Sequence, residues 1–454
     1  MPIQPHSSPE DLTRSLSAAL APQAFDLLRD IAAEARRRRL PLYLVGGFVR
    51  DLLLGRPGLD FDLVVEGDAI GLAKAVAARL GGRTRSHDRF HTAQWFPPPE
   101  RGLPDFLDFI TARSESYAHP GALPTVRPGR MEDDLRRRDF TINTLALRLD
   151  GAHFGELRDD LGGLADLEYG VVRVLHPGSY RDDPTRIFRA VRYEQRYGFR
   201  LSPSDLEWIE AARPLVTALS ADRVRNELNA IFAEPRAAEM LARLAGMGIL
   251  TTIHPALAWD RGAGKRLGRG LAADPPAGWG KVPDLRRVPR REALGSLLWL
   301  ARLDPAEIRS VDARLHFPAP LREALLAGAE LIRLLPDLPG LRPSAVVARL
   351  DEFPPLVLYA GTELAGARPR AVLERYLREW RHVRAGVTGA DLVRAGLESG
   401  PAYDHILTAL RAGWLDGTVA NRAQEADLLE KLLREIPPSP RKSGKITPNT
   451  KKGE

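Results

Sequence analysis

The chain has 454 residues, of which 44% are hydrophobic, and a formal net charge of +7 that comes mostly from arginine. This length predicts several domains with substantial hydrophobic cores, and the basic charge favours nucleic acid as a partner. The absence of cysteine excludes disulfides, cysteine-ligated zinc and thiol catalysis. No apolar run is long enough to cross a membrane, so we expect no membrane association and a cytoplasmic location.

The N-terminal part of the chain combines helices with short strands. Leucine, phenylalanine and isoleucine recur with helical spacing over residues 11–39. Short apolar segments that are typical of strands follow at residues 42–45, 63–65, 92–96, 106–110 and 144–149. These elements predict a head in which a sheet packs against helices.

The remainder of the chain has a helical pattern. Helical periodicity and a richness in alanine, leucine and arginine extend from about residue 155 to about residue 436. Proline- and glycine-rich segments at 255–290 and 316–320 predict loops within this region. Residues 437–454 are rich in proline, serine and lysine, which predicts a disordered basic tail. The predicted fold class is therefore α+β, with a mixed head followed by helices.

The first motif connects a strand to a helix through two glycines. Gly46 and Gly47 follow the predicted strand at 42–45, and Arg50 lies in the first turn of the next helix. Glycine lets the backbone approach an anion closely, and a helix N-terminus favours phosphate. A glycine pair in this position is also compatible with a simple tight turn. We expect Gly46, Gly47 and Arg50 to hold a triphosphate.

Two carboxylates follow this turn. Asp60 and Asp62 lie two residues apart in an apolar segment, and side chains i and i+2 of an extended strand share a face. Two neighbouring like charges need a compensating cation, and Mg²⁺ is the hard ion that one or two carboxylates bind together with substrate phosphates. A solvated strand edge is the alternative, but the position after a glycine turn favours nucleotide chemistry.

The second motif extends from Arg137 to Asn143. Arg138 offers a forked donor beside the carboxylate of Asp139, and Asn143 follows four residues later. In a helix, Asp139 and Asn143 share a face and can act on one ligand, for which the hydroxyls of a nucleotide sugar are suitable. The alternative is a helix N-terminus with a surface salt bridge.

The third motif begins a predicted helix at Pro184, with Asp183 as its N-cap. Arg186, Arg189 and Arg192 recur every three residues and form a basic stripe, while the apolar residues between them pack inward. From spacing alone, the better interpretation is a capped amphipathic helix with a solvated arginine face.

Taken in this order, the motifs resemble the nucleotidyltransferase superfamily, in the subgroup of bacterial tRNA CCA-adding enzymes and poly(A) polymerases. Residues 137–143 are similar to the subgroup's RRDFTxNA motif, with Thr144 in place of alanine. Residues 182–186 are similar to its EDxxR motif, with aspartate in place of the glutamate. Residues 89–93 resemble its RFGTA strand, with His91 where glycine is usual.

The resemblance implies a polymerase-β-like nucleotidyltransferase head with a mixed sheet, followed by an all-α neck, body and tail. The implied domains are a catalytic head at 24–153, a neck with the base-reading helix at 154–234, a body at 235–350, a tRNA-binding tail at 351–436 and a disordered basic tail at 437–454.

The implied activity adds C and/or A from CTP and ATP to the 3′ end of tRNA and releases pyrophosphate. Asp60 and Asp62 would bind two Mg²⁺ ions, one activating the terminal 3′-hydroxyl and one stabilising pyrophosphate. Asp183 and Arg186 would read the base, because cytosine and adenine both present an exocyclic amine beside an unprotonated ring nitrogen. The other expected contacts to the nucleotide sugar or base come from Arg138, Asp139, Asn143, Arg189 and Arg192.

Two other functions share the same motifs: a poly(A) polymerase, and a non-catalytic RNA-binding protein on the same fold. The intact pair of Asp60 and Asp62 argues against the second, and residues 86–90 lack the basic stretch that is usual in poly(A) polymerases. The motifs do not distinguish CC-adding, A-adding and complete CCA-adding enzymes, although the loop at 114–130 disfavours a CC-only enzyme. Asp108 is a candidate third acidic residue near the metals, and the oligomeric state is open.

Overall fold

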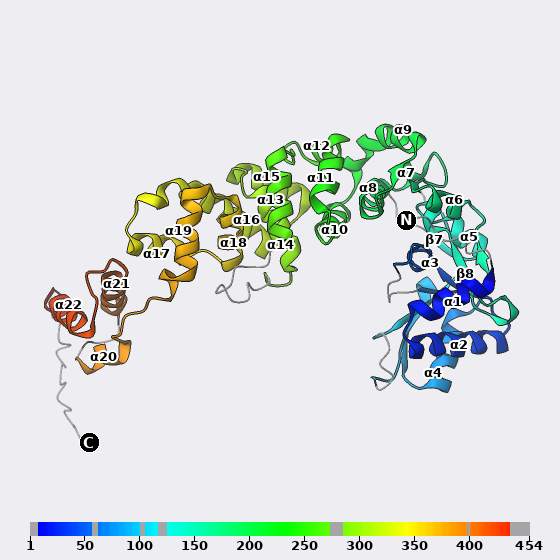
Figure 1. Cartoon of the computed structure of the whole chain (residues 1–454), viewed down its shortest axis with the longest axis horizontal. Helices are drawn as coiled ribbons and strands as arrows, with labels where there is room; N and C mark the ends of the chain where they lie inside the picture. Colours follow the sequence, from blue (N-terminus) through cyan, green and yellow to red (C-terminus); the bar gives the residue numbers. More distant parts are fainter. Residues whose placement is uncertain are drawn as a thin grey trace, which may run out of the picture. The chain divides into compact units, whose positions relative to one another are not determined.

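Figure 1 shows the computed structural model, which describes residues 8–56, 62–99, 105–116, 125–272, 285–395, 397 and 400–435. Contacts divide the chain into two compact units. The first contains Met1–Ala272 and Arg309–Phe317, and the second contains Ala273–Ile308 and Pro318–Glu454.

A seven-stranded mixed sheet forms the centre of the first unit, in the order β3-β4-β5-β2-β1-β8-β9. Its strands are β1 (Leu42–Val45), β2 (Asp62–Val65), β3 (Arg83–His87), β4 (Thr92–Phe96), β5 (Leu107–Thr111), β8 (Ala146–Arg148) and β9 (Leu157–Arg158). The β2–β5 pair is parallel and the other neighbours are antiparallel. The predicted strands at 42–45 and 92–96 are confirmed at both ends, and those at 63–65 and 106–110 are displaced by one residue at one or both ends.

Two parts of the predicted head differ from the structure. The strand predicted at 144–149 is shorter because Thr141–Asn143 forms a 3-10 turn, in which the Thr144 hydroxyl donates to the Thr141 carbonyl at 2.7 Å. Within the loop predicted at 114–130, β6 (Arg113–Ser116) and β7 (Thr125–Pro128) form a hairpin. The connection between these two strands lies outside the described residues.

Helices cover both faces of the sheet. The helical spacing at 11–39 forms two helices, α1 (Pro9–Ala19) and α2 (Pro22–Arg37), because Pro22 begins a new helix after the break at Leu20. Helix α2 packs against α4 (Ala69–Leu80), which contacts β4 and β5. On the other face, Met131 and Leu135 of α5 (Met131–Arg136) pack in one apolar cluster with residues of β1, β2 and β8.

The rest of the first unit is largely helical. Its elements are α3 (Gly47–Leu53) in the head, then α6 (Gly163–Glu168), α7 (Ser179–Asp182), α8 (Thr185–Tyr197), α9 (Pro203–Ala212), α10 (Ala221–Phe232), α11 (Ala237–Gly246), α12 (Ile249–Ile253) and α13 (Arg261–Ala272), with a small parallel pair of β10 (Val171–Val172) and β11 (Arg200–Leu201). The loop predicted at 255–290 was partly wrong, because α13 lies within it. Ala263 and Leu267 of α13 are buried, and the helix packs on α11 despite its glycines.

The second unit contains helices and no strand in its described part. Helix α15 (Pro305–Leu315) contains residues of both units. The other helices of the second unit are α14 (Arg290–Leu300), α16 (Ala319–Leu334), α17 (Pro343–Leu350), α18 (Pro355–Leu364), α19 (Ala367–Arg378), α20 (Gly389–Arg394), α21 (Pro401–Leu415) and α22 (Arg422–Glu435). Helix α18 is buried along its length and contacts α14, α16 and α19. The basic tail predicted at 437–454 lies outside the described residues.

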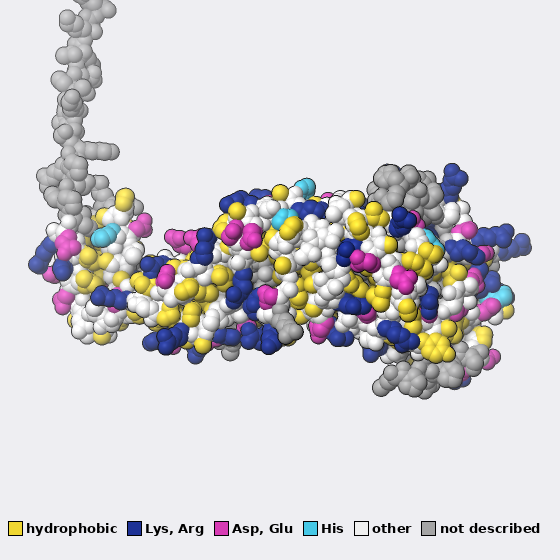
Figure 2. Space-filling model, turned by 90° about the horizontal axis from the view of Figure 1, so that it is seen from above, with side chains coloured by type: hydrophobic (Ala, Val, Ile, Leu, Met, Phe, Trp, Pro, Cys, Tyr) yellow, Lys and Arg dark blue, Asp and Glu magenta, His cyan; other side chains and the backbone are white. Residues whose placement is uncertain are grey.

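Basic side chains are exposed on both units and are interspersed with acidic ones (Figure 2). Within the described ranges, no helix is both long and apolar enough to span a membrane. The observed fold class is the predicted one, a mixed sheet with helices in the head and a predominantly helical remainder. The short β10–β11 pair lies in the neck that was expected to be all-α.

Candidate active site

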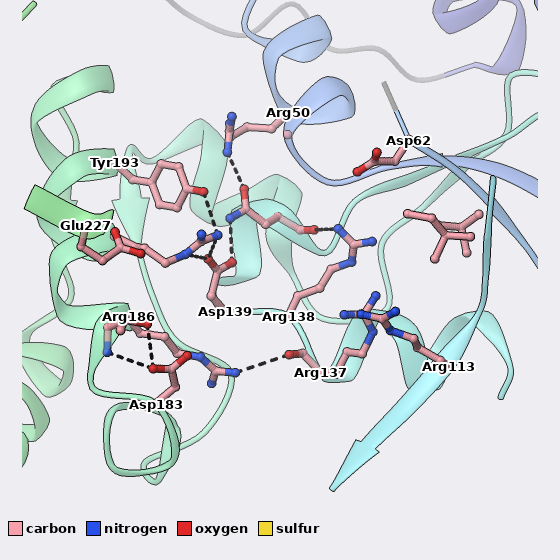
Figure 3. A pocket seen from close by; sticks show the side chains of 16 residues that line it. Arg50, Asp62, Arg113, Arg137, Arg138, Asp139, Asp183, Arg186, Tyr193 and Glu227 are labelled. Atoms are coloured by element: carbon pink, nitrogen blue, oxygen red, sulfur yellow. Dashed lines mark hydrogen bonds and ion pairs between the residues drawn. The ribbon is translucent and has the colours of Figure 1, made fainter. Parts of the chain in front are cut away.

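Most of the predicted site residues line one cavity of about 480 Å³ in the first unit (Figure 3). The head contributes Gly47, Arg50, Asp62, Arg138, Asp139 and Asn143, and the segment at the start of α8 contributes Asp183, Arg186 and Arg189. Seven further lining residues were not predicted as site residues: Val64, Ile110, Arg113, Arg137, Thr185, Tyr193 and Glu227. Arg137 adjoins a predicted residue, whereas Arg113 has no signal in the sequence, because it lies on β6, which is part of none of the three motifs.

The glycine turn brings the first two motifs together. Gly46 precedes α3 with a φ of 66°, a left-handed conformation that favours glycine. A Cβ atom at Gly46 would lie 2.4 Å from Nη1 of Arg138. Glycine is therefore required at this position both by the backbone conformation and by the close approach of the Arg138 guanidinium.

Arg50, which was expected to hold a triphosphate, is enclosed by protein groups. The side chain is 4% exposed, and its Nε and Nη2 donate to the two carboxylate oxygens of Asp51 at 2.9 and 3.0 Å. Nη1 donates to Oδ1 of Asn143 at 2.5 Å, and the guanidinium carbon lies 5.0 and 4.8 Å from the ring centroids of Tyr193 and Tyr197. Burial would lower the pKa of Arg50, but the Asp51 carboxylate outweighs it and raises the pKa.

A buried carboxylate orients the arginines of the second motif. Asp134 is fully buried and accepts from Nε and Nη2 of Arg137 at 3.0 and 2.7 Å and from Nη2 of Arg138 at 2.9 Å. Within the described structure, the buried Nε of Arg138 has no hydrogen-bond partner. Arg138 also lines the cavity, and Arg137, Arg138 and Arg113 converge on one side of it (Figure 3).

Asp139 and Asn143 meet as predicted, although not within an α-helix. Helix α5 ends at Arg136, and Thr141–Asn143 forms a 3-10 turn, so the predicted helical spacing was wrong. The Asn143 amide nevertheless donates to Oδ1 of Asp139 at 2.8 Å. Nε of Arg189 donates to Oδ2 of Asp139 at 2.6 Å. Burial would raise the pKa of Asp139, but Arg189 and Asn143 outweigh it, so the pKa is lowered.

The arginine stripe of α8 is not the solvated face that spacing alone suggested. Arg186 is 7% exposed, and its Nη2 donates to the carbonyl of Arg137 at 3.4 Å. Arg192 contacts Glu227 at 3.5 Å and Glu234 at 3.4 Å and does not line the cavity in the described structure. The apolar side of the helix is buried as predicted.

Asp183 precedes α8 rather than capping it in the predicted way, because Pro184 occupies the cap position. Oδ1 of Asp183 accepts from the backbone N–H and the hydroxyl of Thr185 at 3.0 and 2.7 Å, and from Nη2 of Arg223 at 2.6 Å. Arg223 lies on α10, which is capped by the Ser220 hydroxyl. The spacing of α10 indicates only a Ser-capped amphipathic helix, so the Asp183–Arg223 contact has no local signal.

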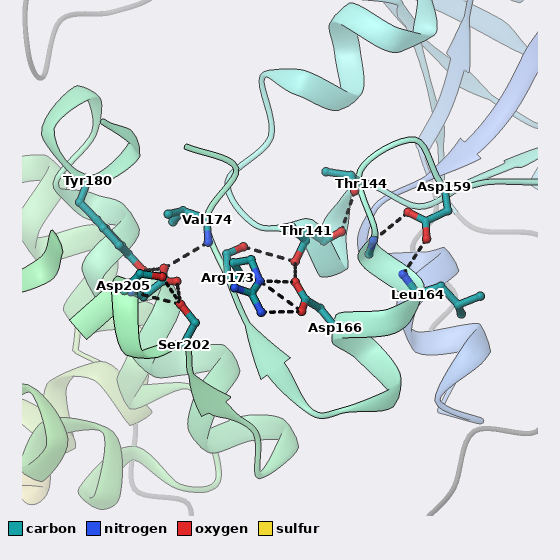
Figure 4. Close-up of polar contacts among 12 residues, drawn as sticks. Thr141, Thr144, Asp159, Leu164, Asp166, Arg173, Val174, Tyr180, Ser202 and Asp205 are labelled. Atoms are coloured by element: carbon teal, nitrogen blue, oxygen red, sulfur yellow. Dashed lines mark hydrogen bonds and ion pairs between the residues drawn. The ribbon is translucent and has the colours of Figure 1, made fainter. Parts of the chain in front are cut away.

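A second set of polar contacts holds the head motif against the following elements (Figure 4). The Thr141 hydroxyl donates to Asp166 at 2.7 Å, and Nε of Arg173 donates to the same carboxylate at 2.9 Å. Farther along, the Tyr180 hydroxyl donates to the buried Asp205 at 2.7 Å. These contacts fix the 3-10 turn that carries Asn143 and the short helix α7 that precedes Asp183.

The acidic side of the cavity carries Asp62. Asp62 is exposed at the start of β2, and it pairs in parallel register with Asp108 of β5, so the two side chains project from the same face of neighbouring strands. Asp60 lies outside the described residues. In the described part of the chain, no three His, Cys, Asp or Glu residues are grouped to hold a metal, but two carboxylates suit the oxygen preference of Mg²⁺.

His91 has a φ of 50°, the left-handed conformation that glycine normally occupies.

We predict that the buried ion pairs make stability depend on acid pH. Burial raises the pKa of Asp134, but Arg138 and Arg137 outweigh it and lower the pKa, as Arg189 does for Asp139. A lowered folded-state pKa contributes stability above the unfolded value of about 3.9, and this stability is lost as the pH falls through the folded-state pKa. The free energy of unfolding should therefore decrease below about pH 4, measured by urea denaturation at a series of pH values.

A pair of substitutions tests whether the ion pairs of Asp134 cause this acid dependence of stability. Asp134→Asn should lower the free energy of unfolding at pH 7 by about 3 kcal/mol and flatten the acid dependence, because it leaves two partly buried guanidinium groups poorly paired. Asp26→Asn, at an exposed carboxylate of α2, should change neither quantity. An unchanged acid dependence in Asp134→Asn would contradict the assignment.

One cavity thus combines Gly47 of the glycine turn, a carboxylate on a mixed sheet and a helix start with a carboxylate and a guanidinium. This combination of groups is suited to the transfer of a nucleotide. The Poly A polymerase head domain matches residues 42–173, and the family described as the probable RNA and SrmB-binding site of polymerase A matches residues 198–260. The first match therefore covers the sheet, and the second covers part of the helical region that follows it.

Whole-chain comparisons extend the match. The chain is 31% identical over 424 residues to the A-adding tRNA nucleotidyltransferase of Halalkalibacterium halodurans, which covers 91% of this chain and 93% of that relative. It is 34% identical over 419 residues to the A-adding tRNA nucleotidyltransferase of Geobacter sulfurreducens, covering 89% of this chain and 47% of the relative, so it spans about half of that protein's length. The structure of a Thermotoga maritima CCA-adding enzyme complexed with tRNA is similar with a TM-score of 0.75 and 27% identity over 93% of this chain and 98% of that one.

The chain belongs to the family of enzymes that contains the A-adding and CC-adding tRNA nucleotidyltransferases. The resemblance drawn from the three motifs is thereby confirmed, as is the predicted polymerase-β-like fold of the head followed by helices.

Proposed function

We propose that this protein transfers a nucleotidyl group from CTP and/or ATP to the 3′ end of tRNA and releases pyrophosphate. The observation that carries this proposal is the single cavity in which the glycine turn, the Asp62 carboxylate and the Asp183–Arg186 pair meet. The names of the A-adding relatives and the tRNA complex of the Thermotoga maritima enzyme support the same substrate class.

The triphosphate and sugar would lie against the head. Gly47 lines the cavity at the start of α3, and the guanidinium of Arg138 lies against Gly46 and offers a charged group beside this turn. Arg50 lines the same cavity, but three of its donors already bind protein acceptors. We therefore assign the direct phosphate contact chiefly to Arg138. Asp139 and Asn143 offer carboxylate and amide groups to the sugar hydroxyls.

Base choice would rest on Asp183 and Arg186 at the start of α8. A carboxylate accepts from the exocyclic amine of cytosine or adenine, and a guanidinium donates to the adjacent ring nitrogen. Uracil and guanine present a carbonyl and an N–H at those positions, so both contacts are reversed. Since each unmade buried hydrogen bond costs about 1–3 kcal/mol, two groups are sufficient for strong discrimination without a nucleic-acid template.

The metal requirement follows from the acidic side of the cavity. Nucleotidyltransferases of the polymerase-β type generally depend on a divalent metal, and we propose that Asp60 and Asp62 hold two Mg²⁺ ions with Asp108 as a neighbouring carboxylate. When bound, Mg²⁺ supplies Lewis-acid stabilisation of the phosphate charge and lowers the pKa of a coordinated hydroxyl. The protein's own contribution in the described residues is to hold Asp62 and Asp108 on one face of β2 and β5.

Binding of tRNA would use the exposed arginines on both units (Figure 2). Arginine binds phosphate in a bidentate manner, and phosphate contacts give affinity without reading sequence. A-form RNA is recognised mostly by its shape and backbone. A helical, arginine-rich chain of this kind is therefore suited to hold many tRNAs in the same way.

Three tRNA transcripts, ending at the discriminator base, at C and at CC, test this proposal. With Mg²⁺ and CTP and ATP supplied separately and together, we expect growth by one to three nucleotides, resolved on a sequencing gel. Extension of the first transcript to CCA would identify a complete CCA-adding enzyme, and extension that stops at CC or that needs the CC transcript would identify a CC-adding or an A-adding enzyme. A long A ladder would instead indicate a poly(A) polymerase, and no product would overturn the proposal.

A further inference from the structure

Arg50 connects three elements of the first unit rather than one. It lies on α3, its Nη1 donates to Asn143 of the 3-10 turn, and its guanidinium lies over two tyrosines of α8. Tyr193 and Tyr197 are one helical turn apart, and their rings stack with centroids 6.2 Å apart. A guanidinium on aromatic faces is held by cation–π attraction as well as by its hydrogen bonds.

Asp51 and Tyr197 complete this connection. The Tyr197 hydroxyl donates to Oδ1 of Asp51 at 2.9 Å, and the same oxygen accepts from Nε of Arg50. Burial, the largest cause, raises the pKa of Tyr197 to about 12, so the hydroxyl stays protonated and donates at any physiological pH. Two consecutive residues of α3 are thus bound to the C-terminal end of α8, one through its guanidinium and one through its carboxylate.

The position of this contact along α8 is what matters for the site. The base-reading pair lies at the N-terminal end of the helix, and Tyr197 lies 11 residues after Arg186, which is about 16 Å along a helix. Helix α3 begins at the glycine turn that would receive the triphosphate. A nucleotide whose triphosphate binds at α3 and whose base binds at the start of α8 therefore requires a fixed distance between the two helices. The Asp51–Tyr197 contact holds them together at the other end of α8.

We propose that Asp51 and Tyr197 are positioning residues that set base selectivity by clamping α8 to α3, an inference that rests on the proposed nucleotidyl transfer. If α8 is free to shift, the correct base loses well-aligned hydrogen bonds to Asp183 and Arg186. A wrong base makes few of these bonds and loses less. Loosening the clamp should thus lower kcat/KM for the correct nucleotide more than for the wrong one.

Tyr197→Phe isolates the clamp, because it removes one hydroxyl and keeps the ring against Arg50. We expect the ratio of kcat/KM for ATP or CTP over GTP or UTP to fall about tenfold, the loss that corresponds to one hydrogen bond to a charged group. Asp51→Asn should reduce the same ratio, and the double variant should be no worse than Asp51→Asn, since both changes remove one shared contact. Thermal melting checks that each variant is folded.

The matched control is Tyr376→Phe in the second unit. The Tyr376 hydroxyl also donates to an aspartate, Asp351, at 2.8 Å, so the same chemical change is made far along the chain from the cavity. At saturating tRNA, this variant should leave the selectivity ratio unchanged. A fall in the ratio in Tyr376→Phe equal to that in Tyr197→Phe would show that the effect is not specific to the clamp.

A binding readout separates the clamp from the proposed function. The affinities of the wild-type chain and of Tyr197→Phe for ATP, CTP and GTP are measured without tRNA. The ratio of the affinity for ATP or CTP to the affinity for GTP should be smaller in the variant. Equal loss of activity or affinity for all nucleotides in Tyr197→Phe would mean that the contact is only structural and would overturn the inference. If the wild-type chain binds ATP or CTP selectively but adds nothing to tRNA, the proposed transfer is contradicted. The clamp would still be supported if the affinity ratio is smaller in Tyr197→Phe than in the wild-type chain.

Discussion

Asp62→Ala should lower kcat for nucleotide addition by about a thousandfold or more while leaving tRNA affinity nearly unchanged. A carboxylate at this position is proposed to hold the cations that neutralise charge in the transition state, and a loss of about 4 kcal/mol of such stabilisation corresponds to three factors of ten in rate. Affinity for tRNA is expected to come instead from phosphate contacts spread over many arginines. Single-turnover extension of a tRNA transcript and filter binding measure the two quantities separately.

Two further variants make this prediction sharper. Asp60→Ala and the double variant with Asp62→Ala should be equally inactive, because neither carboxylate is expected to hold the cations alone. Asp26→Ala removes an exposed carboxylate from α2 in the same unit and should keep full activity. Undiminished addition by the double variant would refute the metal-binding role and with it the assignment of the cavity as the active site.

The sequence predicted those parts of the fold that depend on neighbouring residues. The strand at residues 42–45 and the one at 92–96 were located because each is a short apolar run between polar or glycine-containing segments. The glycine turn after the first of these strands was recognised for the same reason, since a left-handed φ at Gly46 is a local requirement. Family resemblance then supplied the polymerase-β-like arrangement that local patterns leave open.

What the sequence did not show depends on contacts between distant positions. The sequence placed Arg50 in the first turn of a helix, where we expected it to hold a triphosphate, whereas Asn143, which lies 93 residues later, helps to enclose it. Spacing likewise gave α8 a solvated arginine face, whereas Asp139 lies 50 residues before Arg189 and pairs with it. No periodicity within one helix encodes a partner on another element, so these roles emerge only when the chain is folded.

The Asp183–Arg223 contact is the clearest example. Helix α10 has a satisfactory local explanation as a Ser-capped amphipathic helix, and this explanation is correct as far as it goes. In the folded chain, Arg223 donates to Oδ1 of Asp183, which also accepts from Thr185. Three donors thus bind Oδ1 of Asp183 and fix the orientation of the carboxylate, so the position of Oδ2 is also fixed. A base-reading group requires such preorganisation.

Asp183→Asn should change which bases are accepted rather than how tightly tRNA is bound. The amide of asparagine both donates and accepts, so it can meet the carbonyl of guanine or uracil that the carboxylate repels. We expect selectivity for A or C over G or U to fall by about tenfold to a hundredfold, equivalent to about 1–3 kcal/mol for one reversed contact. Competition between labelled nucleotides on a single tRNA transcript, followed by product sequencing, measures the ratio directly.

The adjacent carboxylate supplies the control for this change. Asp182 is half-exposed, contacts His176 at 3.7 Å and does not line the cavity in the described structure, so Asp182→Asn makes the same chemical change one residue away. Selectivity should be unchanged in that variant. If Asp183→Asn instead slowed the addition of all four nucleotides equally, the carboxylate would be supporting the fold of the segment before α8 through Arg223 and Thr185, and base choice would have to be sought in Arg186 and its neighbours.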